Sequence, residues 1–199
     1  MVKDWEKDLP PIARERLARI GELSQEEKDK MIDSEKAASL LAQFYQGHID
    51  CEGLWKKLRQ EGRPSLLREA QLRLIDSLTF GGSPPELKRK KDAILAIETL
   101  KKEQNTSVIE SSLSLLEKLQ KRYKGEIEQA YNDLKAELER NPRLRLKQVQ
   151  QGKSTMVVQL TVDEALKQLP QWQDFLSNQE NRYRQEFAKV MERLKRELK

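Results

Sequence analysis

Two long amphipathic segments near the C-terminal end of the sequence flank residues 143–162, which contain no Asp or Glu. Apolar residues recur at helical spacing on both sides, whereas residues 143–162 contain two runs in which apolar and polar residues alternate as they do in strands. The only common way to connect two such strands over so short a distance is a hairpin. The sequence therefore predicts a helical arm with a small basic β-hairpin between its two halves.

The first helix of the arm is predicted to begin at Ser107, because Ser107 and Glu110 have capping-box spacing. It should end at Asn141, since Pro142 disfavours helical geometry at the residue before it. Its apolar positions are Ile109, Leu113, Leu116, Leu119, Tyr123, Ile127, Ala130, Tyr131, Leu134 and Leu138.

The hairpin is predicted from two alternating runs, Arg143 to Val149 and Thr155 to Val162. In the first run Leu144 and Leu146 share one face, and Arg143, Arg145 and Lys147 share the other. In the second run the apolar face holds Met156, Val158, Leu160 and Val162. A loop of about five residues that contains Gly152 separates the runs. Because a two-stranded hairpin is marginal alone in water, its apolar face should pack on helices or on a third strand from a partner.

The second helix of the arm is predicted to begin at Thr161, which forms a further capping box with Glu164. Pro170 favours a bend or break between Leu169 and Trp172. The apolar stripe comprises Leu166, Leu169, Trp172, Phe175, Leu176, Tyr183, Phe187, Val190, Leu194 and Leu198.

Both helices of the arm repeat their apolar positions at intervals of 11 residues. Tyr123 and Leu134 show this interval in the first helix, and Trp172, Tyr183 and Leu194 show it in the second. Eleven residues in three turns is about 3.67 residues per turn, which favours nearly straight packing. The matching intervals predict that the two helices pair with each other, and the hairpin between them makes the pair antiparallel.

The remainder of the chain is predicted to form helices with short connections. Ser24, Asp50 and Ser83 are each placed to cap a helix start, and Gly62 is placed to end a helix. We expect a docking segment over 1–23, a helical bundle over 24–105 and the helix–hairpin–helix arm over 106–199. The predicted fold class is mainly α: an N-terminal helical bundle followed by a long antiparallel helical pair interrupted by a small β-hairpin.

Composition agrees with an elongated helical protein. Hydrophobic residues make up 37% of the chain and charged residues 36%, against about 45–50% and about 25% in ordinary globular domains. The net charge of +5 is modest for a dedicated nucleic-acid-binding protein. Four positive charges lie in residues 143–162, so the hairpin is the electropositive part of the arm.

The sequence gives little support for catalysis. His48, Asp50 and Cys51 lie close together, but a loop histidine, a helix cap and a half-buried cysteine account for them more simply than a nucleophile and its base do. One histidine and one cysteine cannot supply a usual zinc site. No glycine-rich phosphate loop is present, because Pro84 and Pro85 follow Gly81-Gly82 and lack N–H donors. We expect neither an enzyme nor a cofactor or metal.

Nucleic-acid binding through the basic hairpin is the alternative to protein binding. Arg143, Arg145 and Lys147 would project from one strand face about 7 Å apart, close to the spacing of phosphates along a nucleic-acid strand, and Lys153 lies in the turn. The basic run Lys88 to Lys91 could add to such a surface. The simpler interpretation is that cations on the hairpin prevent unwanted strand pairing.

The single cysteine, Cys51, rules out an intramolecular disulfide, and no apolar run has the length of a membrane span. We therefore expect a soluble, cytoplasmic protein without membrane contact. The helix–hairpin–helix order resembles the layout of prefoldin-type chaperone subunits, which lack an N-terminal bundle like this one, and no residue motif accompanies the order, so no family is assigned. Transcript-cleavage factors also have a coiled-coil arm, but they act through acidic residues at its tip, whereas this tip is basic.

The leading hypothesis is a non-enzymatic helical protein that acts through protein–protein contacts, as an assembly, adaptor or chaperone-like factor, with a homodimer as one form of such contact. The candidate binding residues lie on the hairpin and on the aromatic stripe of the last helix: Arg143, Arg145, Lys147, Lys153, Trp172, Phe175, Tyr183 and Phe187.

Overall fold

The computed structural model describes residues 10, 24–151 and 154–198, and it divides the chain into two compact units. Unit 1 spans residues 1–70 and unit 2 spans residues 71–199, so the division falls within helix α4 (Pro64–Asp76). The expected docking segment, 1–23, lies outside the described residues except for Pro10. The expected domain boundaries after residues 23 and 105 stay a prediction.

Unit 1 contains α2 (Gln25–Tyr45), α3 (Cys51–Glu61) and the first part of α4. The predicted cap at Ser24 is confirmed as a full capping box, in which the Glu27 N–H donates to Ser24 Oγ at 3.2 Å and the Ser24 N–H donates to the Glu27 carboxylate at 2.8 Å. Asp50 caps α3 by accepting the Gly53 N–H at 2.7 Å. Gly62 ends α3 with φ of 61°, a conformation that glycine adopts without strain.

A buried carboxylate connects α2 to the start of α4 within unit 1. Asp33 is buried, accepts a hydrogen bond from Ser65 and forms an ion pair with Arg63. Lys57 of α3 donates to Gln43 of α2 at 2.7 Å. A buried charge is stable only when it is paired or hydrogen-bonded, so Asp33 holds α2 against the start of α4. The hydrogen bond from Lys57 holds α3 against α2.

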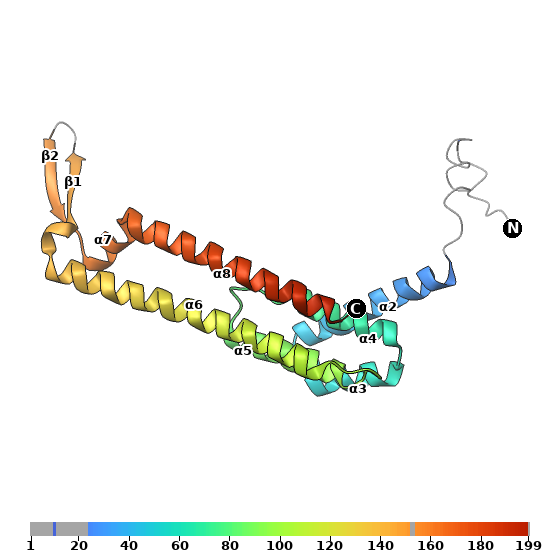
Figure 1. Ribbon diagram of the computed structural model, residues 1–199. Helices are drawn as coiled ribbons and strands as arrows, with labels where there is room; N and C mark the ends of the chain where they lie inside the picture. The colour runs from blue at the N-terminus through green and yellow to red at the C-terminus, as the bar shows by residue number, and fades with distance from the viewer. Residues whose placement is uncertain (1–9, 11–23, 152–153, 199) are drawn as a thin grey trace. The chain divides into compact units, whose positions relative to one another are not determined.

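Unit 2 continues through α5 (Pro84–Glu98), α6 (Thr106–Arg140) and the 3-10 helix η2 (Pro142–Arg145) to the hairpin β1 (Leu146–Gln151) and β2 (Ser154–Gln159). It ends with α7 (Val162–Gln168) and α8 (Pro170–Arg196). Figure 1 shows α6 and α8 side by side in opposite directions, with the hairpin where α6 ends. The predicted fold class, a mainly α chain with an antiparallel helix pair and a small hairpin, is confirmed.

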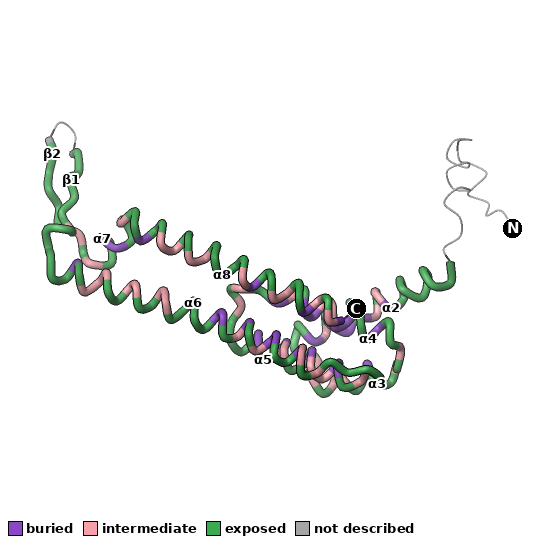
Figure 2. The backbone as a smooth tube through the Cα atoms, in the orientation of Figure 1, coloured by how far each residue is buried: buried purple, intermediate pink, exposed green. Residues whose placement is uncertain are grey.

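Contacts along the helix pair fix its antiparallel register. Asn105, just before α6, donates to the carbonyl of Glu197, just after α8, at 3.4 Å. At the opposite end, the rings of Tyr131 in α6 and Trp172 in α8 lie 6.2 Å apart. Trp172, Tyr183 and Leu194 are all buried, so the 11-residue interval of α8 does mark its packed face, as the purple residues along the pair indicate (Figure 2).

The ends of the helices in unit 2 agree with the sequence except at the start of α6. The Thr161–Glu164 capping box begins α7, and the helix is interrupted before Pro170 as expected. The expected capping box at Ser107 is wrong, because α6 begins one residue earlier, at Thr106. Its N-cap, Asn105, makes no side-chain cap and is held instead by its backbone N–H, which donates to Glu98 at 2.7 Å.

Glu98 is the centre of a buried polar network at the start of the helix pair. Its side chain is 1% exposed and also accepts hydrogen bonds from Gln71 at 2.8 Å and from Lys101 at 2.9 Å. Burial by itself would raise the pKa of Glu98, but the hydrogen bonds from Asn105, Gln71 and Lys101 outweigh it and hold the pKa below the usual value. The carboxylate is therefore stabilised in its ionised form.

No helix within residues 24–151 and 154–198 is long and apolar enough to cross a membrane.

We predict that Glu98→Gln lowers the free energy of unfolding by about 1–3 kcal/mol at pH 7. The NH2 group of glutamine would face the Asn105 N–H, the Gln71 amide and the Lys101 ammonium, all of which are donors and need an acceptor. Since the folded-state pKa of Glu98 is lowered, its contribution is complete above the unfolded-state value of about 4.3 and is lost as the pH falls through the folded-state value. Urea denaturation at pH 7 and at stepwise lower pH should show the difference between wild type and variant shrinking with acidification. The exposed Glu103→Gln is the control, and an equal, pH-independent effect of both variants would contradict the prediction.

Candidate functional site

The hairpin is held at the end of α6 by a small hydrophobic core. This core consists of Leu138, Ala165, Leu166 and Trp172, all buried. Tyr131 donates a hydrogen bond from its hydroxyl to Asp163 at 2.7 Å, which raises the pKa of Tyr131. The hairpin is therefore anchored at its base through α7.

The predicted first strand begins three residues too early. Residues 142–145 form η2, with Pro142 at its first position and the Leu144 N–H donating to the Asn141 carbonyl at 3.1 Å. Proline fixes φ near −65°, which suits a tight helical turn. Arg143 and Arg145 therefore do not share a strand face with Lys147, and strand β1 begins at Leu146.

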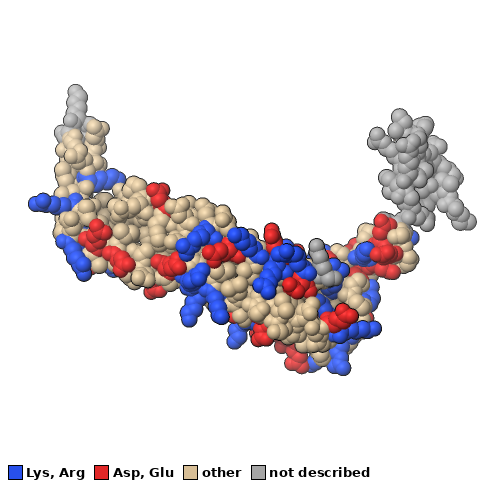
Figure 3. Space-filling model, in the orientation of Figure 1, with Lys and Arg blue, Asp and Glu red and all other residues tan. Residues whose placement is uncertain are grey.

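Two of the candidate cations are used within the chain. The guanidinium of Arg145 donates to the Leu160 carbonyl at 3.4 Å, and the Arg145 carbonyl accepts the Leu160 N–H at 2.8 Å. Lys147 donates to Gln168 of α7 at 2.6 Å. Arg143 is exposed, and Lys153 lies outside the described residues. Figure 3 shows the hairpin largely without charge, with Lys and Arg near its base.

The prominent property of the hairpin and η2 is exposed apolar surface. Six large apolar side chains are between 41% and 61% exposed: Leu144, Leu146, Val149, Met156, Val157 and Val158. The strand register pairs Val149 with Met156 and Lys147 with Val158, so Val149, Met156 and Val158 share one face while Leu146 and Val157 lie on the other.

This exposure corrects one of the two alternatives expected for the apolar face of the hairpin, packing on helices, because the strand side chains described on both faces are exposed (Figure 2). The other alternative, packing on a third strand from a partner, stays a prediction. We call η2 and the described strands, residues 142–151 and 154–159, the tip. Val157 was missed in the sequence because it breaks the alternation expected of a half-buried strand. The unbroken run Met156-Val157-Val158 is the signal that could have revealed it.

The aromatic stripe of α8 lies in the interior. Trp172, Tyr183 and Phe187 are buried, and Phe175 is half-buried with its ring stacked on that of Trp172 at 5.7 Å. Phe80, in the loop before α5, lies 5.8 Å from the ring of Phe187 and 4.9 Å from that of Tyr123. The stripe expected as a second binding surface is thus packed within unit 2.

Tyr183 is fully buried and has its hydroxyl satisfied. The hydroxyl donates to Glu126 at 2.6 Å and accepts from Arg122 at 2.9 Å. The hydrogen bond with Tyr183 raises the pKa of Arg122. Arg182 also lies over the Tyr183 ring, 4.7 Å from its centroid, so α6 and α8 are joined by one polar cluster.

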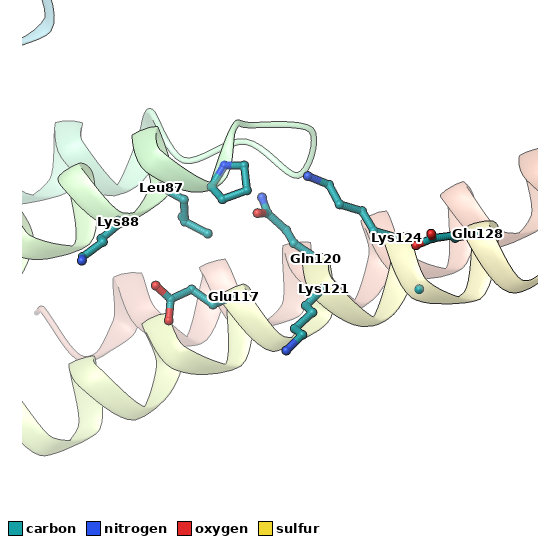
Figure 4. Close-up of a pocket in the computed structure, with 9 residues that line it drawn as sticks. Leu87, Lys88, Glu117, Gln120, Lys121, Lys124 and Glu128 are labelled. Atoms are coloured by element: carbon teal, nitrogen blue, oxygen red, sulfur yellow. The ribbon is translucent and has the colours of Figure 1, made fainter.

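A groove of about 570 Å³ lies between α5 and α6. Its lining residues are Pro84, Leu87, Lys88, Glu117, Gln120, Lys121, Lys124, Gly125 and Glu128. Figure 4 shows Leu87 and Gln120 between the two helices. Gln120 donates to the carbonyls of Thr79 and Phe80 at 3.0 and 2.9 Å, so its amide serves the fold.

The basic run at the start of α5 is largely used inside unit 2. Lys90 is buried and donates to the Ser77 carbonyl at 2.8 Å, and Lys91 pairs with Glu117 at 2.9 Å. Lys88 lines the groove. The run therefore does not form a continuous cationic face.

In the cluster of His48, Asp50 and Cys51, the carboxylate of Asp50 has a structural role as a helix cap. Asp50 caps α3, and Cys51 is the first residue of that helix. Across the described part of the chain, no group of three or more His, Cys, Asp or Glu residues is placed to hold a metal ion.

The fold and the tip define a mainly α protein whose antiparallel helix pair ends in an exposed apolar hairpin. The chain belongs to DUF6657, a family of unknown function, whose sequence profile matches residues 52–199. No curated protein and no solved structure matches the chain.

We predict that Tyr183→Phe lowers the free energy of unfolding by about 1–2 kcal/mol, because the loss of the hydroxyl leaves Glu126 and Arg122 without their shared partner. Chemical denaturation followed by circular dichroism measures this change. Glu128→Gln, an exposed change on the same helix, should alter stability by less than about 0.5 kcal/mol. Equal stability of Tyr183→Phe and wild type would contradict a role for the hydroxyl.

Proposed function

We propose that this protein is a non-enzymatic assembly, adaptor or chaperone-like factor that acts through protein–protein contacts made by the tip. A cytoplasmic location is part of this proposal, in keeping with the single cysteine of the sequence. The binding surface comprises the exposed apolar residues of η2, β1 and β2, and the helix pair positions that surface.

The exposure of six large apolar side chains on the tip is the observation that carries the proposal. Contiguous exposed apolar surface is typical of interaction sites, because water is released when a partner covers it. A two-stranded hairpin with both faces in water is also marginal by itself. Contact with another polypeptide would remedy both conditions at once.

Nucleic-acid binding has weaker support from the geometry of the tip. Arg145 and Lys147 are used in intramolecular hydrogen bonds, and they are not aligned with Arg143 along one strand. Phosphate binding would need several cations free to replace counterions. A salt titration of filter binding on wild type and on an Arg143, Arg145, Lys147 triple alanine variant tests this alternative directly.

We predict that the triple variant Val149→Thr, Met156→Thr, Val158→Thr loses its protein partner by at least tenfold in affinity purification from the native host. Threonine is β-branched, like the two valines, and favours strands at all three positions, while its hydroxyl makes the surface polar. Its melting temperature should stay close to that of the wild type, since these side chains are exposed.

Leu115→Gln is the matched control, because Leu115 is 42% exposed on α6 and lies outside the tip. This variant should retain the partner. Equal recovery of partners by the threonine variant and the wild type would remove the tip as the binding surface.

A further inference from the structure

We propose that the partner of the β2 edge is a second copy of this chain, so that two hairpins form one four-stranded antiparallel sheet. This inference rests on the proposed function, because it uses the tip as the contact surface. It adds that one partner is a second copy of the chain, and it specifies the strand register in which the two copies pair.

The first argument is that the outer edge of β2 offers unpaired backbone groups. Among the described residues the sheet contains two strands, so each has a free edge. The Leu160 N–H bonds to the Arg145 carbonyl, and hydrogen-bonded pairs then alternate along the ladder. Met156 and Val158 therefore direct their backbone groups toward β1, whereas Thr155, Val157 and Gln159 direct theirs outward.

The second argument is that charge distinguishes the two edges. Natural proteins block free edges with charged residues, lysine above all, or with proline. Strand β1 carries Lys147 and directly follows η2, which contains Arg143 and Arg145. Strand β2, Ser154–Gln159, contains neither a charged residue nor proline. A β1-to-β1 contact would bring cations of two copies together, whereas a β2-to-β2 contact would not.

The third argument is that β2 is complementary to itself in one antiparallel register. A twofold axis through Val157 pairs Val157 with Val157 of the partner subunit, and both then use their outward backbone groups. The same axis places Met156 opposite Val158 of the partner subunit. Thr155 lies opposite Gln159 of the partner subunit at the end of the paired segment.

This register joins the exposed apolar residues of both copies. On one face Val149, Met156 and Val158 of each chain form one continuous cluster across the axis. On the other face Leu146 and Val157 of each chain do the same. The exposed strand residues on both faces of the hairpin thus gain neighbours from one contact.

Light scattering on the full chain tests the inference. At roughly 50 µM, above the micromolar dissociation constant of a weak specific dimer, the wild type should be dimeric. Val157→Lys and Val157→Glu should each be monomeric, because like charges lie directly opposite across the axis. An equimolar mixture of these two variants should restore the dimer, which shows that both remain folded. Gln148→Lys is the control, since Gln148 pairs with Val157 from β1 and lies away from the axis, and it should stay dimeric.

The register is tested by disulfide formation in a Cys51→Ser background. Val157→Cys should give a covalent dimer on oxidation, because residues paired across the axis have Cα atoms about 5.5 Å apart. Thr155→Cys should not, because its two copies lie roughly 13 Å apart along the strands. Efficient crosslinking of Thr155→Cys, with none of Val157→Cys, would overturn the register.

A wild type that is monomeric, or a dimer that persists in Val157→Lys, would overturn pairing through β2. The proposed function would survive that result if the threonine variant of the tip still lost a different protein partner. Loss of no partner, together with a monomeric wild type, would reject both.

Discussion

Burial of aromatic side chains between α6 and α8 is the interaction on which unit 2 depends. Tyr183 can lie in the interior because Glu126 and Arg122 satisfy its hydroxyl, and an unsatisfied hydroxyl there would cost about 1–3 kcal/mol. Phe80 closes the seam from the loop before α5. With 35 residues, α6 is about 52 Å long. The contacts of Tyr183 and Phe80 hold the middle of that helix, and the small core at Leu138 and Trp172 holds the end that bears the hairpin.

Caps that act within three residues were predictable from the sequence, and so was the pairing of α6 with α8, whereas contacts that one particular side chain makes with another element were not. Caps at Ser24, Asp50, Ser83 and Thr161 act over three residues, so their spacing was sufficient to place four helix starts. The start of α6 depends on Glu98, which binds Asn105 from the end of another helix. The burial of the α8 stripe likewise depends on Phe80, which contacts Tyr183 and Phe187, residues more than a hundred positions later in the sequence.

The structure gives the candidate binding residues of the hairpin a different setting from the one that the sequence predicts. Charge was the visible signal in the sequence, yet Arg145 and Lys147 stabilise the base of the hairpin. The apolar face of the hairpin was expected to pack on helices or on a third strand from a partner, and within the chain its strand residues Met156 and Val158 are exposed. Alternation alone cannot distinguish these cases, because both faces of β2 carry apolar side chains and the sequence does not say which face has a neighbour.

The break at Leu169 makes the two halves of the arm unequal in continuity. Along α6 an unbroken ladder of backbone hydrogen bonds leads up to the tip, whereas on the return path Leu169 is extended and Pro170 has no N–H to offer. The side chain of Gln173 bridges this break by donating to the Lys167 carbonyl at 3.0 Å. The path into the hairpin is therefore one helix, and the path out of it is two helices joined at Leu169.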